Sequence, residues 1–322
     1  MAGRCMSAPR NLIAVVGPTA VGKTTLAIAL ARRFDGEIVN ADSRQVYTGM
    51  DIGTAKPTAA ELREARHHLI DIRPPDAAIS LGEYLPLAHE RIESIAARGK
   101  LPILCGGSGQ YVWAVLEGWE IPRVPPDPDL RACLERRLAA HGPDSLWREL
   151  RHLDPNRAAA VDRQNPRRII RALEIVKSTG STVAAGKSAE PPYRSFVIGL
   201  TADRAALYQR ADARFDAMMA EGLLDEARRL GAAGHALGSG ALSGVGYTEL
   251  GLYLQGEMFL DEAVSRAKTR THRLVRRQYT WFKTDDPRIH WLDATHGLPV
   301  DQAALATGRF LEQSNPCDTI GA

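Results

Sequence analysis

The 322-residue sequence has only four cysteines, which lie far apart and form no C-x-x-C pair. This scarcity argues against a zinc site and against a disulfide framework, and it suits a reducing compartment. No apolar run approaches the roughly 20 residues that a transmembrane helix needs, so no membrane association is expected. The first eleven residues contain two arginines but no apolar stretch. We therefore expect no secretory signal and a cytoplasmic location.

Acidic residues are absent from residues 266–283, which contain seven Lys or Arg residues and are named the basic segment. Because the whole chain has a formal charge of +3, the rest of the chain has a charge of −4. Such local basicity is typical of a surface that binds a polyanion. Tyr279, Trp281 and Phe282 add rings that can stack on unpaired RNA bases. A solvated helix surface is the alternative interpretation.

The chemistry is indicated most strongly by residues 17–24, the P-loop, which fit the pattern G-x-x-x-x-G-K-[ST]. An apolar run typical of a buried strand precedes them, and a run of helix formers follows. In this setting backbone N–H groups bind phosphate oxygens at a helix N-terminus, the lysine adds positive charge, and the Thr24 hydroxyl can ligate Mg²⁺. The sequence predicts a diphosphate or triphosphate site formed by Gly17, Pro18, Thr19, Ala20, Val21, Gly22, Lys23 and Thr24.

Further strands are expected at residues 37–40, 101–105, 196–200 and 289–292, and helical stretches alternate with them. This alternation predicts an α/β fold of the P-loop NTPase-like type, with a mostly parallel sheet and helices on both faces. One of the helices is expected to run without a break over residues 203–230. The core is expected to be discontinuous, formed by residues 11–120 and 194–300, with a C-terminal tail of residues 301–322.

Residues 121–193 differ from the rest because they contain no convincing strand. Asp127, Asp154 and Asn165 each precede a proline, so each is expected to cap a helix whose first residue is that proline. Asp144 is expected to cap a fourth helix, and the last helix is expected to end at Gly180. We interpret the segment as an all-helical insertion domain, and Arg163, Arg167, Arg168 and Arg171 make it a second basic region.

Two polar residues follow expected strands at the carboxyl edge of the sheet, where open α/β sheets bind ligands. Asp42 could bind Mg²⁺ indirectly, accept a proton from a nucleophile, or only cap a helix. Ser108 lies in a glycine-rich turn, where its hydroxyl could contact a ligand or only cap the next helix. His67 and His68 are not expected to bind a metal together, because adjacent side chains on a helix point in different directions.

Several motifs resemble, in order, those of the bacterial tRNA dimethylallyltransferases. The likeness covers roughly residues 11–293, although Ser108 stands where that family usually has threonine and Gln110 where an apolar residue is common. The matching motifs are Gly17–Thr24, Asp42–Tyr47, Asp51–Pro57, His67–Asp71, Gly106–Tyr111, Asn165–Glu174, Val245–Glu249 and Arg276–Phe282.

The resemblance implies transfer of a dimethylallyl group from dimethylallyl diphosphate to N6 of adenosine 37 in tRNAs that read codons starting with U. It implies that Asp42 accepts the N6 proton or holds that amine, that the P-loop and Mg²⁺ bind the leaving diphosphate, and that Ser108 and Arg214 assist. It also implies a monomer that binds the tRNA anticodon stem-loop. The implied tRNA-binding residues are Asp42, Ser43, Arg44, Gln45, Ser108, Arg131, Arg167, Arg168, Ile169, Ile170, Arg171, Gly246, Tyr247, Arg273, Arg276, Arg277 and Gln278.

Three other functions stay open from the residues alone. A P-loop kinase or nucleotidase acting on a small molecule would use ATP but gives no reason for the basic segment. An isopentenyltransferase acting on free adenine nucleotides leaves the helical insertion unexplained. A non-enzymatic RNA-binding protein would not need Lys23, Thr24 and Asp42 together.

Overall fold

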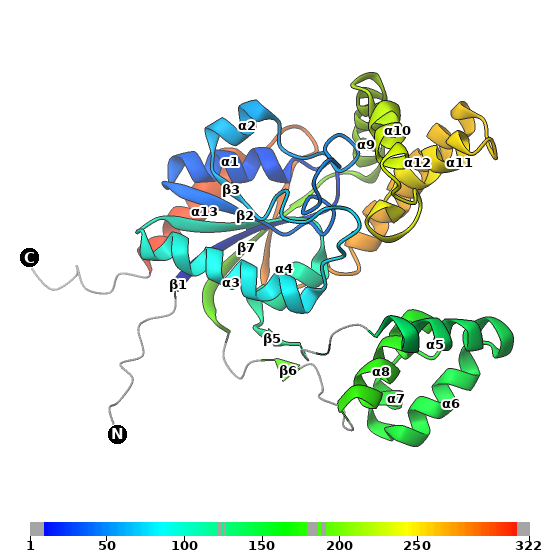
Figure 1. Ribbon diagram of the computed structural model, residues 1–322. Helices are drawn as coiled ribbons and strands as arrows, with labels where there is room; N and C mark the ends of the chain where they lie inside the picture. The colour runs from blue at the N-terminus through cyan, green and yellow to red at the C-terminus, as the bar shows by residue number, and fades with distance from the viewer. Residues whose placement is uncertain (1–9, 122–123, 125–126, 180–185, 188–190, 314–322) are drawn as a thin grey trace, which may run out of the picture. The chain divides into compact units, whose positions relative to one another are not determined.

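The computed structural model describes residues 10–121, 124, 127–179, 186–187 and 191–313. It contains two compact units, a larger one of residues 1–117 and 191–322 and a smaller one of residues 118–190 (Figure 1). No helix in the described part of the chain is long and apolar enough to cross a membrane.

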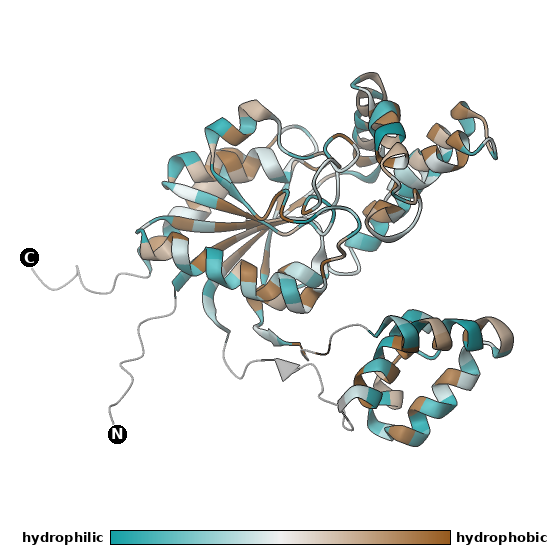
Figure 2. Cartoon of the chain, in the orientation of Figure 1, coloured by the Kyte–Doolittle hydropathy of each residue, from teal (hydrophilic) through white to brown (hydrophobic). Residues whose placement is uncertain are grey.

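The larger unit is built on a six-stranded sheet with the order β3-β2-β4-β1-β7-β8, in which all neighbouring strands are parallel. Helices cover both faces of this sheet, and the central strands are strongly apolar (Figures 1 and 2). The predicted α/β fold is thus confirmed. The strands are β1 (Arg10–Val16), β2 (Gly36–Asn40), β3 (His67–His68), β4 (Leu101–Cys105), β7 (Tyr193–Thr201) and β8 (Ile289–Asp293).

The strand order brings the motifs that follow β1, β2 and β4 to one edge of the sheet. Strand β1 pairs with β4 with Val15 opposite Cys105, and β2 pairs with β4 with Asn40 opposite Cys105. The P-loop, the turn after Asn40 and the glycine-rich turn after Cys105 therefore lie side by side at the carboxyl edge. This is the edge where a ligand was expected.

The helices of the larger unit correct two expectations. The helix expected over residues 203–230 is broken at Gly222, whose φ of 104° is a left-handed conformation that favours glycine. Residues 301–322 were expected to form a tail, but a helix over Val300–Glu312 buries Ala303 and Ala304 in the main core. The helices are α1 (Lys23–Arg33), α2 (Ala59–Glu64), α3 (Leu81–Ala97), α4 (Gly109–Leu116), α9 (Arg204–Ala220), α10 (Leu223–Ala232), η1 (Gly240–Ser243), α11 (Tyr247–Leu254), α12 (Leu260–Gln278) and α13 (Val300–Glu312).

The smaller unit packs four helices around its own apolar cluster, which includes Leu146 and Leu150. Its helices are α5 (Pro128–His141), α6 (Pro143–Leu153), α7 (Pro155–Ala160) and α8 (Pro166–Thr179). A two-residue antiparallel pair, β5 (Trp119–Glu120) and β6 (Gly186–Lys187), was not expected in an all-helical segment.

Three of the four expected helix caps are confirmed. The side chains of Asp127, Asp154 and Asn165 accept hydrogen bonds from backbone N–H groups in the first turns of α5, α7 and α8, at 2.9, 2.7 and 3.2 Å. Asp144 is not a cap, because α6 begins one residue earlier, at Pro143. The expected helix end at Gly180 lies outside the described residues.

Candidate active site

The P-loop connects β1 to α1 and is held in a tight conformation. Gly17 has a φ of 140° and lies against the Leu200 carbonyl, which leaves no room for a side chain. The Lys23 ammonium donates a hydrogen bond to the Pro18 carbonyl oxygen at 2.7 Å. Burial lowers the pKa of Lys23 from 10.5 to about 8, with a smaller lowering from Arg214. The lysine is therefore held in the loop and is still mostly charged at neutral pH.

Two cavities meet beside the P-loop. The P-loop cavity, of about 80 Å³, is lined by Lys23, Thr24 and Asp42 among others. The wide cavity has a volume of about 380 Å³. The residues that line both are Thr19, Asp42, Thr54, Ala55, Gly107 and Arg214. A ligand on the P-loop and a second ligand in the wide cavity would therefore meet at this shared wall.

Asp42 is fixed in a turn rather than at a helix start. Its backbone N–H donates to Asn40 Oδ1 at 3.0 Å, and its own Oδ1 accepts the Arg44 backbone N–H at 2.8 Å. No helix begins here, so the helix-cap interpretation of Asp42 is wrong. Its second oxygen, Oδ2, has no hydrogen-bond partner among the described residues and can take a proton.

Ser108 joins the turn after β4 to the turn after β2. It precedes α4, but its side chain makes no capping hydrogen bond. Its Oγ instead accepts the Ser43 backbone N–H at 2.9 Å and lies 3.2 Å from Ser43 Oγ. The simple cap interpretation is wrong, and Ser108 lines the wide cavity beside Asp42.

Arg214 reaches the P-loop from α9, a helix almost two hundred residues away in the sequence. Its guanidinium donates a hydrogen bond to Thr19 Oγ1 and lines both cavities. Burial lowers the pKa of this arginine, while Asp42 opposes the shift. Arg214 therefore adds a cation to the shared wall, in addition to Lys23 in the P-loop cavity.

Gln278 connects the P-loop to the turn after β4. Its side chain, 8% exposed, accepts the Thr19 backbone N–H at 2.8 Å and donates to the Gly107 carbonyl oxygen at 3.1 Å. Both the oxygen and the nitrogen of the amide therefore form hydrogen bonds within the protein. These contacts make Gln278 a clamp on the phosphate site, and because the residue also lines the wide cavity, its expected contact with tRNA stays a prediction.

Arg44 and Gln45 are likewise bonded within the larger unit. The Arg44 guanidinium donates to the Gly240 carbonyl oxygen at 2.9 Å and to Ser243 Oγ at 2.9 Å. Gln45 Nε2 donates to the carbonyl oxygens of Thr54 and Ala55 at 3.1 and 2.9 Å. Both residues shape the cavity walls, and Arg44 lines the wide cavity together with Ser43.

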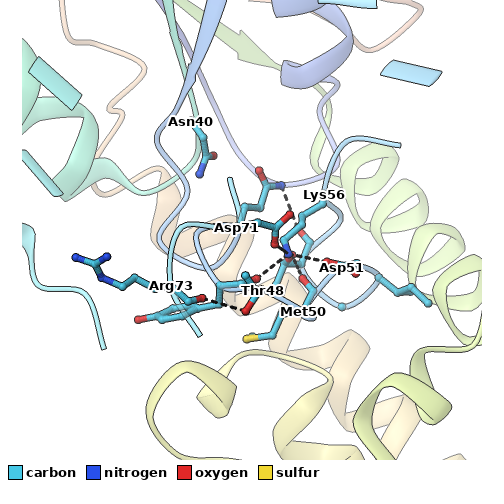
Figure 3. A network of polar contacts seen from close by, with 12 residues as sticks. Asn40, Thr48, Met50, Asp51, Lys56, Asp71 and Arg73 are labelled. Carbon is cyan, nitrogen blue, oxygen red and sulfur yellow. Dashed lines mark hydrogen bonds and ion pairs between the residues drawn. The ribbon is translucent and has the colours of Figure 1, made fainter. Parts of the chain in front are cut away.

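The segment of residues 51–57, between the two cavities, is held from both sides. Glu226 of α10, 1% exposed, accepts three successive backbone N–H groups, of residues 51, 52 and 53, at 2.9, 2.9 and 3.0 Å. Lys56 contacts Asp71, donates to Asp51 Oδ1 at 2.6 Å and donates to the Tyr47 carbonyl oxygen at 2.6 Å (Figure 3). A buried glutamate that anchors a distant loop has no local sequence pattern, and Glu226 was not foreseen.

Tyr247 and Gly246 were expected to contact tRNA, but their contacts are internal. Tyr247 is 1% exposed, and its hydroxyl donates to Glu226 Oε1 at 2.6 Å. Gly246 has a φ of 91°, and its N–H donates to Glu249 Oε2 at 2.9 Å. Tyr247 lines the wide cavity and packs against Gly53 of the segment of residues 51–57. The expected contact of both residues with tRNA stays a prediction.

The walls of the wide cavity also contain apolar side chains that, apart from Trp281, the sequence did not single out for chemistry. They come from segments before and after the sheet strands and from three helices, so only the fold brings them together. They are Met50, Tyr111, Phe215, Met218, Val245, Leu274 and Trp281.

The basic segment is only partly free of acidic partners. Arg266 pairs with Glu262 at 2.7 Å, Lys268 pairs with Asp216 at 2.6 Å, and Arg270 pairs with Glu249. The basic segment therefore has less unpaired positive charge than its lack of acidic residues indicated. Three exposed arginines remain whose side chains pair with no described acid, namely Arg273, Arg276 and Arg277.

The expected tRNA-binding residues of the smaller unit fall into three groups. Ile169 and Ile170 are 0% and 5% exposed in the core of the unit, so their side chains are not available for the expected contact with tRNA. Arg131 and Arg171 both bond the buried Glu174, at 2.7 and 3.1 Å. Only the last group, Arg167 and Arg168, is exposed and pairs with no described acid.

Comparisons with known proteins agree with this architecture. A family model described as IPP transferase matches residues 45–285. The tRNA dimethylallyltransferase of Roseiflexus sp. strain RS-1 is 54% identical over 94% of this chain and 99% of its own. That of Chloroflexus aurantiacus (strain ATCC 29366 / DSM 635 / J-10-fl) is 49% identical over 85% of this chain and 93% of its own.

Solved structures give the same result. The tRNA isopentenylpyrophosphate transferase of Bacillus halodurans has a TM-score of 0.72 and is 40% identical, covering 95% of this chain and 98% of its own. A eukaryotic dimethylallyltransferase acting on tRNA has a TM-score of 0.82 and is 26% identical, covering 97% of this chain and 81% of its own. The chain belongs to the IPP transferase family, which includes the tRNA dimethylallyltransferases.

Proposed function

We propose that the protein transfers a dimethylallyl group from dimethylallyl diphosphate to N6 of adenosine 37 in tRNAs that read codons starting with U. The products are N6-dimethylallyladenosine and diphosphate. The observation that carries the proposal is the shared wall between the two cavities, where Asp42 and Arg214 face both. A diphosphate on the P-loop and an adenine in the wide cavity would meet beside Asp42.

The chain's own groups account for each part of the reaction. The P-loop N–H groups, Lys23 and Arg214 stabilise negative charge on the diphosphate as the bond between its oxygen and the allylic carbon breaks. The N6 lone pair forms the new bond to that carbon, and Asp42 Oδ2 accepts the N6 proton. Positioning of the amine against the allylic carbon then supplies much of the rate.

The wide cavity suits a base that has been flipped out of the anticodon loop. Its apolar and aromatic walls, such as Tyr111, Phe215 and Trp281, offer surfaces on which a purine can stack and which exclude water. The same walls can accept the five-carbon allyl group. Ser108, tied to Ser43 beside Asp42, orients the wall where the amine would lie.

Mg²⁺ fits the residues present, as a metal held mainly by its substrate. Within the described residues no group of three or more His, Cys, Asp or Glu side chains could form a metal cage. Mg²⁺ usually keeps several waters and uses one or two protein ligands plus substrate phosphates. The Thr24 hydroxyl would hold it, with Asp42 in reach through water, and bound Mg²⁺ would neutralise charge on the diphosphate.

We also propose that the exposed arginines hold the phosphates of the tRNA anticodon stem-loop. Arg273, Arg276 and Arg277 of α12 and Arg167 and Arg168 of α8 are the best candidates, because their charges are not used in described ion pairs. Contacts of this kind position the RNA without reading its sequence. Glu174 partly neutralises the charges of Arg131 and Arg171, so these two arginines would contribute less to phosphate binding.

A transfer assay tests the proposal against its alternatives. The protein is incubated with labelled dimethylallyl diphosphate, Mg²⁺ and either unmodified tRNA, AMP or ATP. We expect label in tRNA alone, and none in a tRNA whose position 37 is guanosine. Label in AMP would favour an isopentenyltransferase of free nucleotides, and ATP turnover without labelled RNA would favour a kinase.

A further inference from the structure

His67 is a half-buried residue that the proposed mechanism does not use. It lies on the edge strand β3, opposite Ile38 of β2, and its ring lines the P-loop cavity together with Lys23 and Thr24. Its Nδ1 is 2.8 Å from the Ala65 carbonyl oxygen. Its Nε2 is shielded from bulk water and has no hydrogen-bond partner among the described residues.

The Ala65 contact fixes which ring nitrogen carries the hydrogen. A carbonyl oxygen can only accept, so Nδ1 must donate, and the neutral ring then presents a lone pair at Nε2. Burial lowers the pKa of His67 below its ordinary value of 6.5, so the ring is neutral at pH 7. His67 therefore offers an unpaired acceptor at the wall of the P-loop cavity.

A buried acceptor without a partner is uncommon in a folded protein and calls for a donor. A diphosphate bound to Mg²⁺ does not supply one, because the metal favours its deprotonated form, whose oxygens are acceptors. A water molecule can donate one hydrogen to Nε2 and the other to a phosphate oxygen. Water bound to Mg²⁺ is an especially good donor, and metal sites use nearby acceptors to orient such waters.

We propose that His67 is a positioning residue of the P-loop cavity, whose Nε2 accepts a hydrogen bond from a water molecule bound with the Mg²⁺–diphosphate. The inference rests on the proposed function, because it needs that ligand in this cavity. Asp42 is the sole carboxylate among the described residues that line the cavity. The unpaired Nε2 of His67 adds a further acceptor at the wall of this cavity that can orient the bound waters.

His68 provides a matched control on the same strand. Successive side chains of a strand point to opposite faces of the sheet. The ring of His68 does not line the P-loop cavity, and its Nε2 lies 2.7 Å from Glu37 Oε2. Loss of this imidazole therefore perturbs β3 without removing a group from the cavity.

The test measures binding rather than activity. Stabilisation of the full-length protein against thermal unfolding by inorganic diphosphate is followed as Mg²⁺ is titrated. His67→Ala should raise the Mg²⁺ concentration for half-maximal stabilisation roughly 10-fold, the usual effect of losing an outer partner of a metal site. His67→Gln should recover part of this loss, because its carbonyl oxygen can accept a hydrogen bond. His68→Ala should leave the midpoint close to that of the wild type.

The outcomes separate this inference from the proposed function. Wild-type protein that fails to bind Mg²⁺–diphosphate would contradict both. Binding by the wild type together with an unchanged midpoint for His67→Ala, or an equal change for His68→Ala, would overturn the role of His67 alone. The ¹⁵N shifts of the ring give a second readout, since a protonated Nε2 in the complex would mean a direct bond to phosphate instead of an accepted bond from water.

Discussion

Replacing Gln278 with alanine should weaken the diphosphate site while leaving phosphate contacts to tRNA nearly intact. The buried amide bonds the Thr19 N–H of the P-loop and the Gly107 carbonyl of the turn after β4. Thr19 and Gly107 line both the wide cavity and the P-loop cavity. The substitution therefore unties the two loops that form the shared wall.

The magnitude follows from the two hydrogen bonds. Each contributes about 1 kcal/mol net, so the free energy of unfolding should fall by about 2 kcal/mol. The Thr19 N–H belongs to the loop that binds phosphate. We therefore expect the free energy of diphosphate binding to weaken by up to the same amount, about 2 kcal/mol. At 1.4 kcal/mol per tenfold change, diphosphate should bind up to about 30-fold more weakly.

The assay compares two affinities in one variant. Diphosphate affinity is measured by calorimetry in Mg²⁺, and tRNA affinity by filter binding at fixed salt. Gln255→Ala is the matched control, because Gln255 is exposed and its side chain makes no described hydrogen bond. Loss of tRNA affinity with unchanged diphosphate affinity and unchanged thermal stability would refute the clamp and favour Gln278 as an RNA contact alone.

Three further predictions concern charge and packing. Burial holds the pKa of Lys23 at about 8 rather than 10.5, so the unfolded chain binds that proton more tightly. In urea unfolding, the free energy of unfolding of the ligand-free wild type should therefore rise from pH 8 to 10.5 relative to that of Lys23→Met. Over the same range the diphosphate affinity of the wild type should fall, because the ammonium is lost. Ile169→Ala should destabilise the smaller unit by about 2–5 kcal/mol in circular dichroism melts, whereas Arg167→Ala should weaken tRNA binding with no change in the melt. Arg277→Ala should reduce the slope of log affinity for tRNA against log salt by about 1, and Arg266→Ala, whose charge is paired with Glu262, should leave that slope unchanged.

The local parts of the fold were predictable from the sequence because they depend on neighbouring residues. Apolar runs of strand length placed β1, β2, β4, β7 and β8, and the Asp-Pro pairs placed the starts of α5 and α7. Errors arose where a tertiary contact decided the outcome. The last helix was taken for a tail because its small buried residues, Ala303 and Ala304, carry little apolar signal without the core they pack on.

The candidate site shows the same division. Motifs at strand ends indicated Lys23, Thr24, Asp42 and Ser108 together, since parallel strands bring their carboxyl ends to one edge. Whether a polar side chain faces a cavity or binds within the protein cannot be read from spacing. Gln278 lies in a basic, aromatic segment that favours RNA contact, yet its amide is buried between two loops. Glu226 lies in no motif, and the motif His67–Asp71 did not assign chemistry to its histidine.

The most direct test of the central claim is a single-turnover measurement on Asp42→Asn with diphosphate binding followed in parallel. Asparagine keeps the acceptor for the Arg44 N–H but cannot take the N6 proton. We expect transfer to tRNA to slow by at least about 100-fold, the usual effect of losing a general base, while Mg²⁺–diphosphate still binds with near wild-type affinity. Transfer at an undiminished rate would contradict the assignment of Asp42 as the proton acceptor between the two cavities.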